Sequence, residues 1–210
     1  MSAIDERRPT NMTLTVQIQI DEASLQEVEH VLRAIPRGFP RVMRRGINRT
    51  VDMAATDLKR RIAEEIELPK GEVAKGIGKR HASFANLAGA VGAKPHRPSL
   101  TKFKGTRQLK RGVKYRIGKQ GFKFIEHAFI ATMKSGHRGV FLRARYAKGH
   151  FVPMEGRPTR EAIFGRRGPS IWQVITNTPG LLTEANQKAA ENLSKQVNDY
   201  IGLELRRWAK

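Results

Sequence analysis

The strongest constraint on the fold is an apolar stripe at helical spacing, which occurs twice in this chain of 210 residues. In residues 42–66 the apolar side chains recur in steps of three to five, and in residues 182–205 in steps of three and four. Such steps place apolar side chains on one face of a helix. We therefore expect two long amphipathic helices, the second over residues 178–206 with Thr178 as its N-cap and Pro179 in its first turn.

Shorter runs predict strands and turns. "TLTVQIQI" alternates apolar and polar residues, which is typical of a half-buried strand, and "SLQEVEHVLRAI" opens with a capping-box pair, which predicts a short helix. "GVKYRIGK", "FKFIEHAFIATM" and "GVFLRAR" predict three strands of an antiparallel meander, with "KSGHRG" as a hairpin turn and the later "EGRPTREAIFGRRGPS" as a loop. The expected class is α+β, an antiparallel β-sheet packed against long amphipathic helices.

The positive charge is concentrated in the middle of the chain. The formal net charge is +21, although residues 1–68 carry 11 basic and 11 acidic residues. Residues 69–125 carry 15 Lys and Arg side chains and a single acidic residue, Glu72, and residues 134–170 carry nine basic and two acidic residues. A charge of this size points to a polyanionic partner, which is a nucleic acid, an anionic membrane surface or an acidic protein.

The first part of this basic region also lacks an apolar period. Residues 69–112 are rich in Gly, Pro, Lys and Arg, and only "LAGAVGAK" indicates a weak strand. Loops of this length inside a compact domain are usually functional or become ordered when a partner binds. We therefore expect an extended basic loop at 69–112 within a single domain that spans residues 1–210.

Composition narrows the chemistry further. The chain contains no cysteine, which leaves it without disulfides, thiol nucleophiles or cysteine-based zinc sites. The first residues, "MSAIDERRPTNM", hold no apolar signal-peptide core, and no run of 18 apolar residues occurs. These features predict a soluble protein that is not exported by the Sec pathway and has no membrane partner.

No pattern of residues predicts catalysis. His127, His137 and His150 lie at spacings that match no compact metal-binding motif, and no G-x-S-x-G or complete phosphate-loop motif is present. A metal-dependent nuclease needs clustered carboxylates, whereas the acidic residues of the basic region are scattered. They are Glu72, Glu126, Glu155 and Glu161. We expect no catalytic residue, no cofactor and no metal, and the protein is expected not to be an enzyme.

The residues favour sequence-independent contact with a polyanion. Basic side chains supply charge for phosphates or for acidic groups, and no base-reading motif accompanies them. The candidate contact residues are Lys94, Arg97, Lys102, Lys104, Arg107, Lys110, Arg111, Lys114 and Arg116. Aromatic residues lie between them and offer stacking faces for single strands, or else pack in the core of the meander, which we expect for Tyr115, Phe122 and Phe124.

Five blocks of the sequence resemble a known family when they are taken in order. They are "VMRRGINRTVDMAATDLKRRIAEE", "LPKGEVAKGI", "GHRGVFLRA", "GRPTREAIFGRRGPSIWQVI" and "LLTEANQKAAENLSKQVNDYI". Their succession, from about Val42 to Leu205, resembles the minor tail protein Z family of long-tailed phages and prophages. The individual motifs are structural rather than catalytic, and the strand and helix before Val42 lie outside the resemblance.

The resemblance implies a tail completion protein of the virion, which acts late in assembly at the head-proximal end of the tail, in the head–tail joining region. The partners implied are the tail terminator, tail tube or tape-measure proteins and the head–tail connector proteins. A homo-oligomeric, hexameric ring and non-specific contact with phage DNA are also expected. The protein would be found in the phage tail, and in the host cytoplasm during assembly.

A second segment is a candidate for contact between subunits. The extended Pro- and Gly-rich backbone of residues 145–172 leaves aromatic and basic side chains available to a neighbour, unless the aromatic ones cap the domain's own core. The docking candidates are Phe151, Arg157, Phe164, Arg166, Arg167 and Trp172. The alternative function is a sequence-independent nucleic-acid-binding or processing protein of a mobile element that uses the same basic segment.

Overall fold

A computed structural model describes most of the chain, namely residues 14–17, 22–119, 121–147, 150–153 and 162–209. Contacts divide the described residues into two compact units. Unit 1 is drawn from Met1–Ala54, Gly78–Lys94 and Thr183–Lys210, and unit 2 from Ala55–Ile77 and Pro95–Leu182. The expected single domain over residues 1–210 is not tested by this division and stays a prediction.

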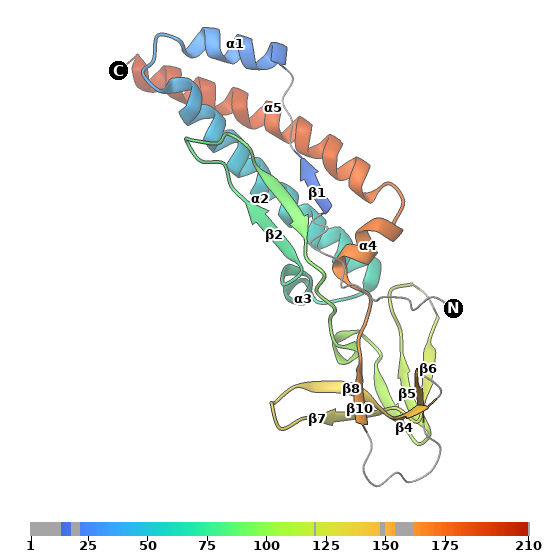
Figure 1. Cartoon of the computed structure of the whole chain (residues 1–210). Coiled ribbons are helices and arrows are strands. Elements are labelled where there is room, and N and C mark those ends of the chain that lie inside the picture. The colour runs from blue at the N-terminus through green and yellow to red at the C-terminus, as the bar shows by residue number, and fades with distance from the viewer. Residues whose placement is uncertain (1–13, 18–21, 120, 148–149, 154–161, 210) are drawn as a thin grey trace, which may run out of the picture. The chain divides into compact units, whose positions relative to one another are not determined.

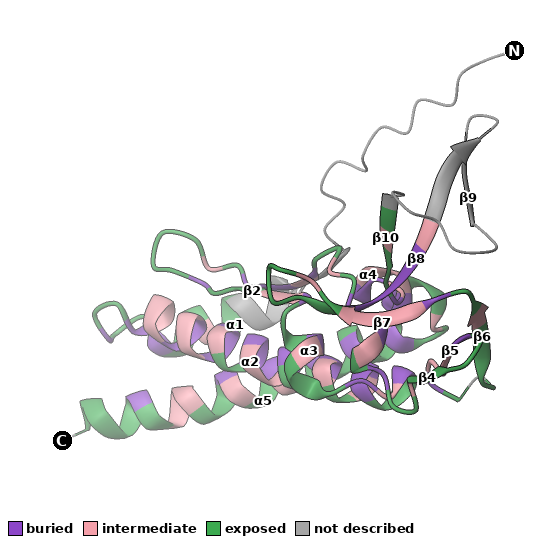
Figure 2. Cartoon of the chain, turned by 90° about the horizontal axis from the view of Figure 1, so that it is seen from below, coloured by how far each residue is buried: buried purple, intermediate pink, exposed green. Residues whose placement is uncertain are grey.

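Unit 1 is built on helices. They are α1 (Glu22–Leu32), the first half of α2 (Gly38–Ile66) and nearly all of α5 (Leu181–Trp208), and α2 and α5 lie side by side in Figure 1. A glycine lets them approach closely, because a Cβ at Gly46 would stand 3.0 Å from Cγ2 of Val197. In Figure 2 buried residues in purple recur along both helices, and the other residues are mostly pink on α2 and mostly green on α5. The two predicted amphipathic helices are therefore confirmed.

The start of α5 differs from the prediction. The helix begins at Leu181, and Thr178 is instead the C-cap of the short helix α4 (Ile171–Asn177). The hydroxyl of Thr178 donates a 2.8 Å hydrogen bond to the carbonyl oxygen of Val174. This side chain therefore caps the end of α4 rather than the start of α5. Gly180, at φ +76°, then separates the two helices with a backbone conformation that suits glycine.

The sheet of unit 1 has the strand order β1-β3-β2, from β1 (Leu14–Gln17), β2 (Ile77–Arg80) and β3 (Ala90–Ala93). Small residues bring it close to α2. A Cβ at Gly89 would stand 2.6 Å from side-chain carbons of both Ile47 and Val51, so only glycine fits. Asn48 of α2 exchanges two hydrogen bonds with the backbone of Ala82, which fixes the chain after β2 against the helix.

Unit 2 contains the second half of α2, two short helices, α4 and most of the strands. The short helices are α3 (Lys70–Ala74) and the 3-10 helix η1 (Leu100–Lys102). One sheet has the order β4-β5-β6, from β4 (Arg107–Leu109), β5 (Gly112–Tyr115) and β6 (Lys123–Glu126). The other has the order β10-β8-β7, from β7 (Phe129–Thr132), β8 (Arg138–Ala147) and β10 (Ala162–Arg166), and β9 (His150–Pro153) also pairs with β8.

The predicted single meander is wrong, although the class α+β and the antiparallel pairing are confirmed. "FKFIEHAFIATM" forms two strands, β6 and β7, which belong to different sheets. The break is at His127, whose φ of +56° turns the chain out of the extended conformation. The hairpin turn at "KSGHRG" is confirmed, because β7 and β8 pair on either side of it and Gly136 has φ +78°.

Two segments predicted as loops contain regular structure. Residues 69–112 hold α3, β2, β3, η1 and β4, and "EGRPTREAIFGRRGPS" contains β10. Apolar residues anchor the first segment, because Val73, Val91, Leu100 and Phe103 are at most 3% exposed. The buried residues are spread unevenly, with three in β3 and none in β2 or β4, so they produce no period that sequence analysis could detect.

The helix α4 was not expected, although the sequence carries a signal for it. Ser170 accepts a hydrogen bond from the backbone N–H of Gln173, and the Gln173 side chain accepts one from the backbone N–H of Ser170. This reciprocal pair is a capping box, whose S-x-x-Q pattern precedes the apolar run "IWQVI". The same pattern would have predicted the helix.

A buried carboxylate lies near the end of α5 in unit 1. The side chain of Glu204 is 3% exposed and forms ion pairs with Arg41 and Arg45 of α2 and with Arg207 of its own helix. The contact with Arg41 is also a hydrogen bond, whereas the other two pairs are 3.8 and 3.9 Å long. A buried charge needs partners of this kind, since an unpaired one is costly.

We expect Glu204→Ala to lower the free energy of unfolding by about 1–3 kcal/mol, because it removes a charged hydrogen bond between α2 and α5. Urea denaturation followed by circular dichroism measures the change. Glu191→Ala, at an exposed position of the same helix, is the matched control and should change stability by less than about 0.5 kcal/mol. Equal losses in the two variants would contradict a stabilising role for the buried carboxylate.

Candidate nucleic-acid interface

The register of the β4-β5-β6 sheet aligns two cations and a ring. Arg107 is opposite Lys114, and Lys114 is opposite Phe124, so the three residues form one row across the strands. Side chains alternate between the faces of a strand, which puts Leu109 and Glu126 on the same face as this row. We call this face, from Arg107, Leu109, Gly112, Lys114, Phe124 and Glu126, the outer face.

The opposite face of the sheet is tied to the rest of unit 2. Val113 is fully buried there. Its cross-strand neighbour Gln108 donates hydrogen bonds to the carbonyl oxygens of Gly112 and Ala128 at 3.1 and 3.2 Å, and accepts one from the N–H of Ile130 at 2.8 Å. One amide thus joins β4 to the start of β7, and the outer face takes no part in this contact.

Two phenylalanines are exposed at this sheet. Phe122 is 51% and Phe124 is 49% exposed, so the expectation that they lie in a core is wrong. Figure 2 accordingly shows β6 largely in the colour of exposed residues. A Cβ at Gly112 would stand 2.9 Å from Cζ of Phe124, which means that the ring extends across the glycine. Alternation explains the exposure of Phe124, because Val113 takes an inner position of β5 while Phe124 lies on the outer face of β6, and Phe122 comes just before this strand.

Cations lie over the ring of Phe122. Lys114 Nζ is 4.1 Å from the ring centroid, and Arg116 Cζ is 5.4 Å away. The turn at Gly105 also approaches this ring, since a Cβ there would stand 3.0 Å from it. Cation–π contacts at exposed sites stabilise by about 0.5–1 kcal/mol each. The contacts therefore hold positive charge close to an exposed aromatic surface.

The predicted contact residues are only partly brought together. Arg107, Lys110, Arg111, Lys114 and Arg116 lie on the β4-β5-β6 sheet, in its hairpin or just after β5. Lys102 is in η1, and Lys104 is in the turn that approaches Phe122. Arg97 is exposed in the segment before η1. Lys94 follows β3 in unit 1, outside the unit that holds this sheet.

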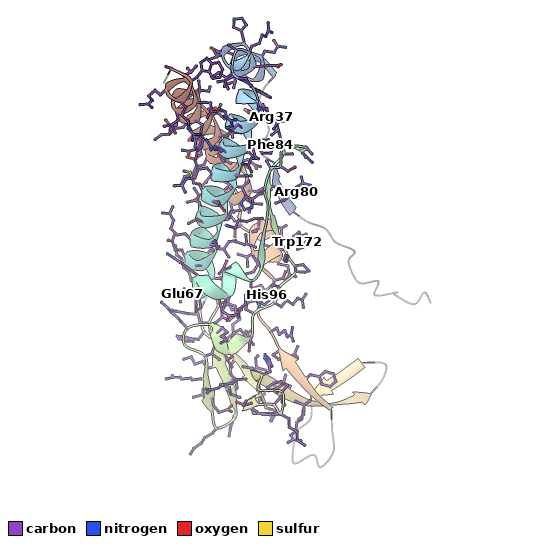
Figure 3. The ribbon with its side chains drawn as sticks, turned by 90° about the vertical axis from the view of Figure 1, so that its left-hand side faces the viewer. Arg37, Glu67, Arg80, Phe84, His96 and Trp172 are labelled. Atoms are coloured by element: carbon purple, nitrogen blue, oxygen red, sulfur yellow. The ribbon has the colours of Figure 1, made fainter. Side chains whose placement is uncertain are left out.

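Some of the predicted contact cations form ion pairs with acidic side chains and others do not. Arg116 Nη2 is 2.5 Å from Oε2 of Glu67, which is labelled in Figure 3, and Lys102 Nζ is 3.9 Å from Glu72. Seven of the predicted contact cations form no ion pair with any described residue, and we call the five of them on or beside this sheet the unpaired set. They are Lys104, Arg107, Lys110, Arg111 and Lys114. Unpaired cations release counterions when they meet phosphates, so they are the ones that contribute to binding.

Glu72, the one acidic residue of the basic segment, is a partner of lysines. Its carboxylate is 2.8 Å from Lys75 Nζ and 3.9 Å from Lys102 Nζ. The hydrogen bond from Lys75 lowers the pKa of Glu72 from its ordinary value of 4.5, and partial burial offsets part of this effect. Glu72 therefore compensates local charge on α3 and η1.

A polar cavity of about 460 Å³ lies in unit 2. It is lined by Thr101, Lys102, Thr106, Ile130, Gly136, His137 and Arg138. The hydroxyls of Thr101 and Thr106 donate to the backbone carbonyl oxygens of Arg138 and Leu100, which leaves the basic side chains as the groups that can hold an anion.

The predicted docking residues do not form one described cluster. Phe164 is half-buried in β10, Arg166 is exposed on it, and Arg167 is exposed beside its backbone bridge to Ser99. Trp172 is half-buried in the first turn of α4, and its buried Nε1 has no hydrogen-bond partner among the described residues. The side chain of Phe151 and all of Arg157 lie outside the described part of the chain. A docking role for these residues stays a prediction.

No metal centre or membrane span is found in the part of the chain that the structure describes. That part contains no group of three or more His, Cys, Asp or Glu side chains that could hold a metal ion. The helices α2 and α5 are long enough to cross a bilayer, but neither is sufficiently apolar to do so. His137 directly precedes β8, and its ring packs edge-on against the ring of Phe141 with 6.2 Å between the centroids.

Comparison with known proteins identifies a family. The family model described as prophage minor tail protein Z matches residues 77–210, which is more than half of the chain. The match begins later than the resemblance from Val42 and includes the whole β4-β5-β6 sheet. No curated protein and no solved structure matches the chain.

We expect substitution of the unpaired set by glutamine to reduce the salt dependence of duplex DNA binding. Each phosphate contact that is lost should lower the slope of log K against log salt concentration by about 0.9. Fluorescence anisotropy over a salt series measures the slope for variants that change the residues of the unpaired set one after another, starting with Lys104, Arg107, Lys110 and Arg111. Lys195→Gln, on the exposed side of α5, is the control. Indistinguishable slopes for the wild type and the fourfold variant would contradict DNA contact at this surface.

We expect the stability contributed by Glu72 to depend on pH. Because its pKa is lowered in the folded state, the contribution is fully present above about pH 4.5, the ordinary pKa, and is lost as the pH falls through the lower folded value. Glu72→Gln should therefore melt at a lower temperature than the wild type near neutral pH, and the difference should vanish in strong acid. A difference that stays constant over this range would argue against the ion pairs as its cause.

Proposed function

Since the chain belongs to the prophage minor tail protein Z family, we propose that it completes the phage tail at its head-proximal end. A phage minor tail protein is a structural component of the virion and interacts with other tail proteins. The partners proposed here are the tail terminator, tail tube or tape-measure proteins on one side and head–tail connector proteins on the other. Assembly takes place in the host cytoplasm before the protein becomes part of the particle.

The observation that carries this proposal is the unpaired set on and beside the outer face. Five cations without ion pairs in the described residues, next to two exposed rings, form a surface that suits a polyanion. A protein at the end of a tube that conducts DNA has to hold phosphates without reading bases, and fixed cations perform that task. The proposal therefore includes non-specific contact with the genome through unit 2.

Assembly into a ring of identical subunits is also part of the proposal. The last turns of α5 in unit 1 expose three large apolar side chains, with Leu203 at 47%, Leu205 at 41% and Trp208 at 59%. Apolar side chains that gather at one helix end are typical of surfaces that a neighbouring subunit covers. A hexameric ring would give each copy such a neighbour.

The decisive experiment is complementation of a phage that lacks this gene. We expect wild-type protein to restore infectious particles, and the variant with glutamine at all five positions of the unpaired set to lower the titre at least tenfold. Electron microscopy should then show filled heads and separate tails, because the defect lies at the joining step. Lys195→Gln should complement like the wild type.

Mass spectrometry of purified particles provides the second readout. The protein should be present in low, fixed copy number, as expected for a ring at one end of the tail. Its absence from mature particles would overturn the structural role, and full complementation by the fivefold variant would overturn the role of the cations.

A further inference from the structure

We infer that the outer face binds single-stranded nucleic acid, with unpaired bases stacked on Phe124 and phosphates held by the row of cations beside it. This inference rests on the polyanion contact of the proposed function and specifies its ligand. Single-stranded DNA and single-stranded RNA present the same bases and phosphates to such a surface. Two features of the sheet carry the inference, namely an open ring and the spacing of the cations.

The ring of Phe124 is open. It is 49% exposed, and among the described residues no aromatic ring and no cation stacks on it. Phe122 and Phe84 are exposed too, but each already has a cation over its ring. Phe84, labelled in Figure 3, lies between β2 and β3 of unit 1, with Arg44 Cζ 4.4 Å from its centroid. The free aromatic surface of this sheet is therefore on Phe124.

The cations stand at a suitable distance from that ring. Adjacent strands of a sheet are about 4.8 Å apart, so Lys114 is one strand away from Phe124 and Arg107 is two strands away in the same row. Aromatic rings that stack successive bases, combined with cations that follow the backbone, are the general design of single-strand binding surfaces. A base on Phe124 would place its phosphates within reach of both cations.

Stacking distinguishes a single strand from the other polyanions. In a duplex the faces of the bases are covered by their neighbours, so an exposed ring adds little to duplex affinity, whereas cations contribute to both forms. An acidic protein segment offers carboxylates to the cations but no flat π-surface to the ring. The aromatic contribution to affinity is therefore the quantity that separates the three ligands.

The test compares substitutions of the ring with substitutions of the cations in the full-length protein. Fluorescence anisotropy is measured with labelled oligothymidine of about 15 nucleotides, with oligouridine, with an abasic strand of the same length and with a duplex. We expect Phe124→Ala and Phe124→Leu to weaken oligothymidine binding by about tenfold while leaving the duplex unchanged. Arg107→Gln with Lys114→Gln should weaken all four ligands.

Three controls keep the result specific. Phe124→Tyr retains a stacking ring and should bind like the wild type, and Phe84→Ala removes an exposed ring from unit 1 and should have no effect. Phe124→Leu keeps an apolar side chain across Gly112, so a loss of binding in this variant at an unchanged melting temperature cannot be attributed to unfolding. The oligouridine arm tells whether RNA is bound as well as DNA.

The outcomes separate this inference from the proposed function. Wild-type binding to the abasic strand as tight as to oligothymidine, or equal losses for duplex and single strand in Phe124→Ala, would overturn the stacking role while leaving phosphate contact intact. Binding to an oligoglutamate peptide but to no nucleic acid would overturn both kinds of nucleic-acid contact. In that case the surface would serve an acidic protein, and complementation would still report on the tail role independently.

Discussion

Like charges in unit 2 have to remain in contact with water, and the other features of that unit follow from this constraint. The part of the basic segment that belongs to unit 2, residues 69–77 and 95–125, carries 12 cations against one carboxylate, so few of them can be neutralised within the segment. Strands satisfy the constraint well, because their period of two buries Val113 and leaves Arg107 exposed and Lys114 half-exposed on the other face. Phe124 of the outer face is exposed for the same reason, as it lies in one row with Lys114 and Arg107.

The long helices could be predicted because their apolar residues repeat over many turns, which a random arrangement does not do. Of the short strands, β3 was indicated only weakly by "LAGAVGAK" and β2 was not predicted, since each contains a single β-branched residue among glycine, alanine and basic residues. Their positions depend on a tertiary fit, in which Gly89 lies against Ile47 and Val51 of α2. Local propensity carries little information where a missing side chain, rather than a present one, decides the packing.

Sequence analysis predicted which types of residue make up the candidate site but not how these residues are arranged. Sequence analysis identified the basic residues, yet it could not know that Arg116 is engaged by Glu67, which precedes it by 49 residues. The exposure of Phe122 and Phe124 was missed because an aromatic residue in an apolar run normally indicates a core. The strand register, which determines which residues share a row, becomes visible only once the pairing partners are known.

The buried carboxylate of α5 has a consequence for alignment. Ala185, Ala189, Leu193 and Val197 recur at nearly equal steps, so an apolar stripe of this kind could slide along α2 by one turn with little change in buried surface. Glu204 favours the observed register, in which it is hydrogen-bonded to Arg41 and lies 3.8 Å from Arg45, because a carboxylate buried without such partners is costly. A single buried charge thus contributes to the choice among near-equivalent alignments, as a polar position does in a coiled coil.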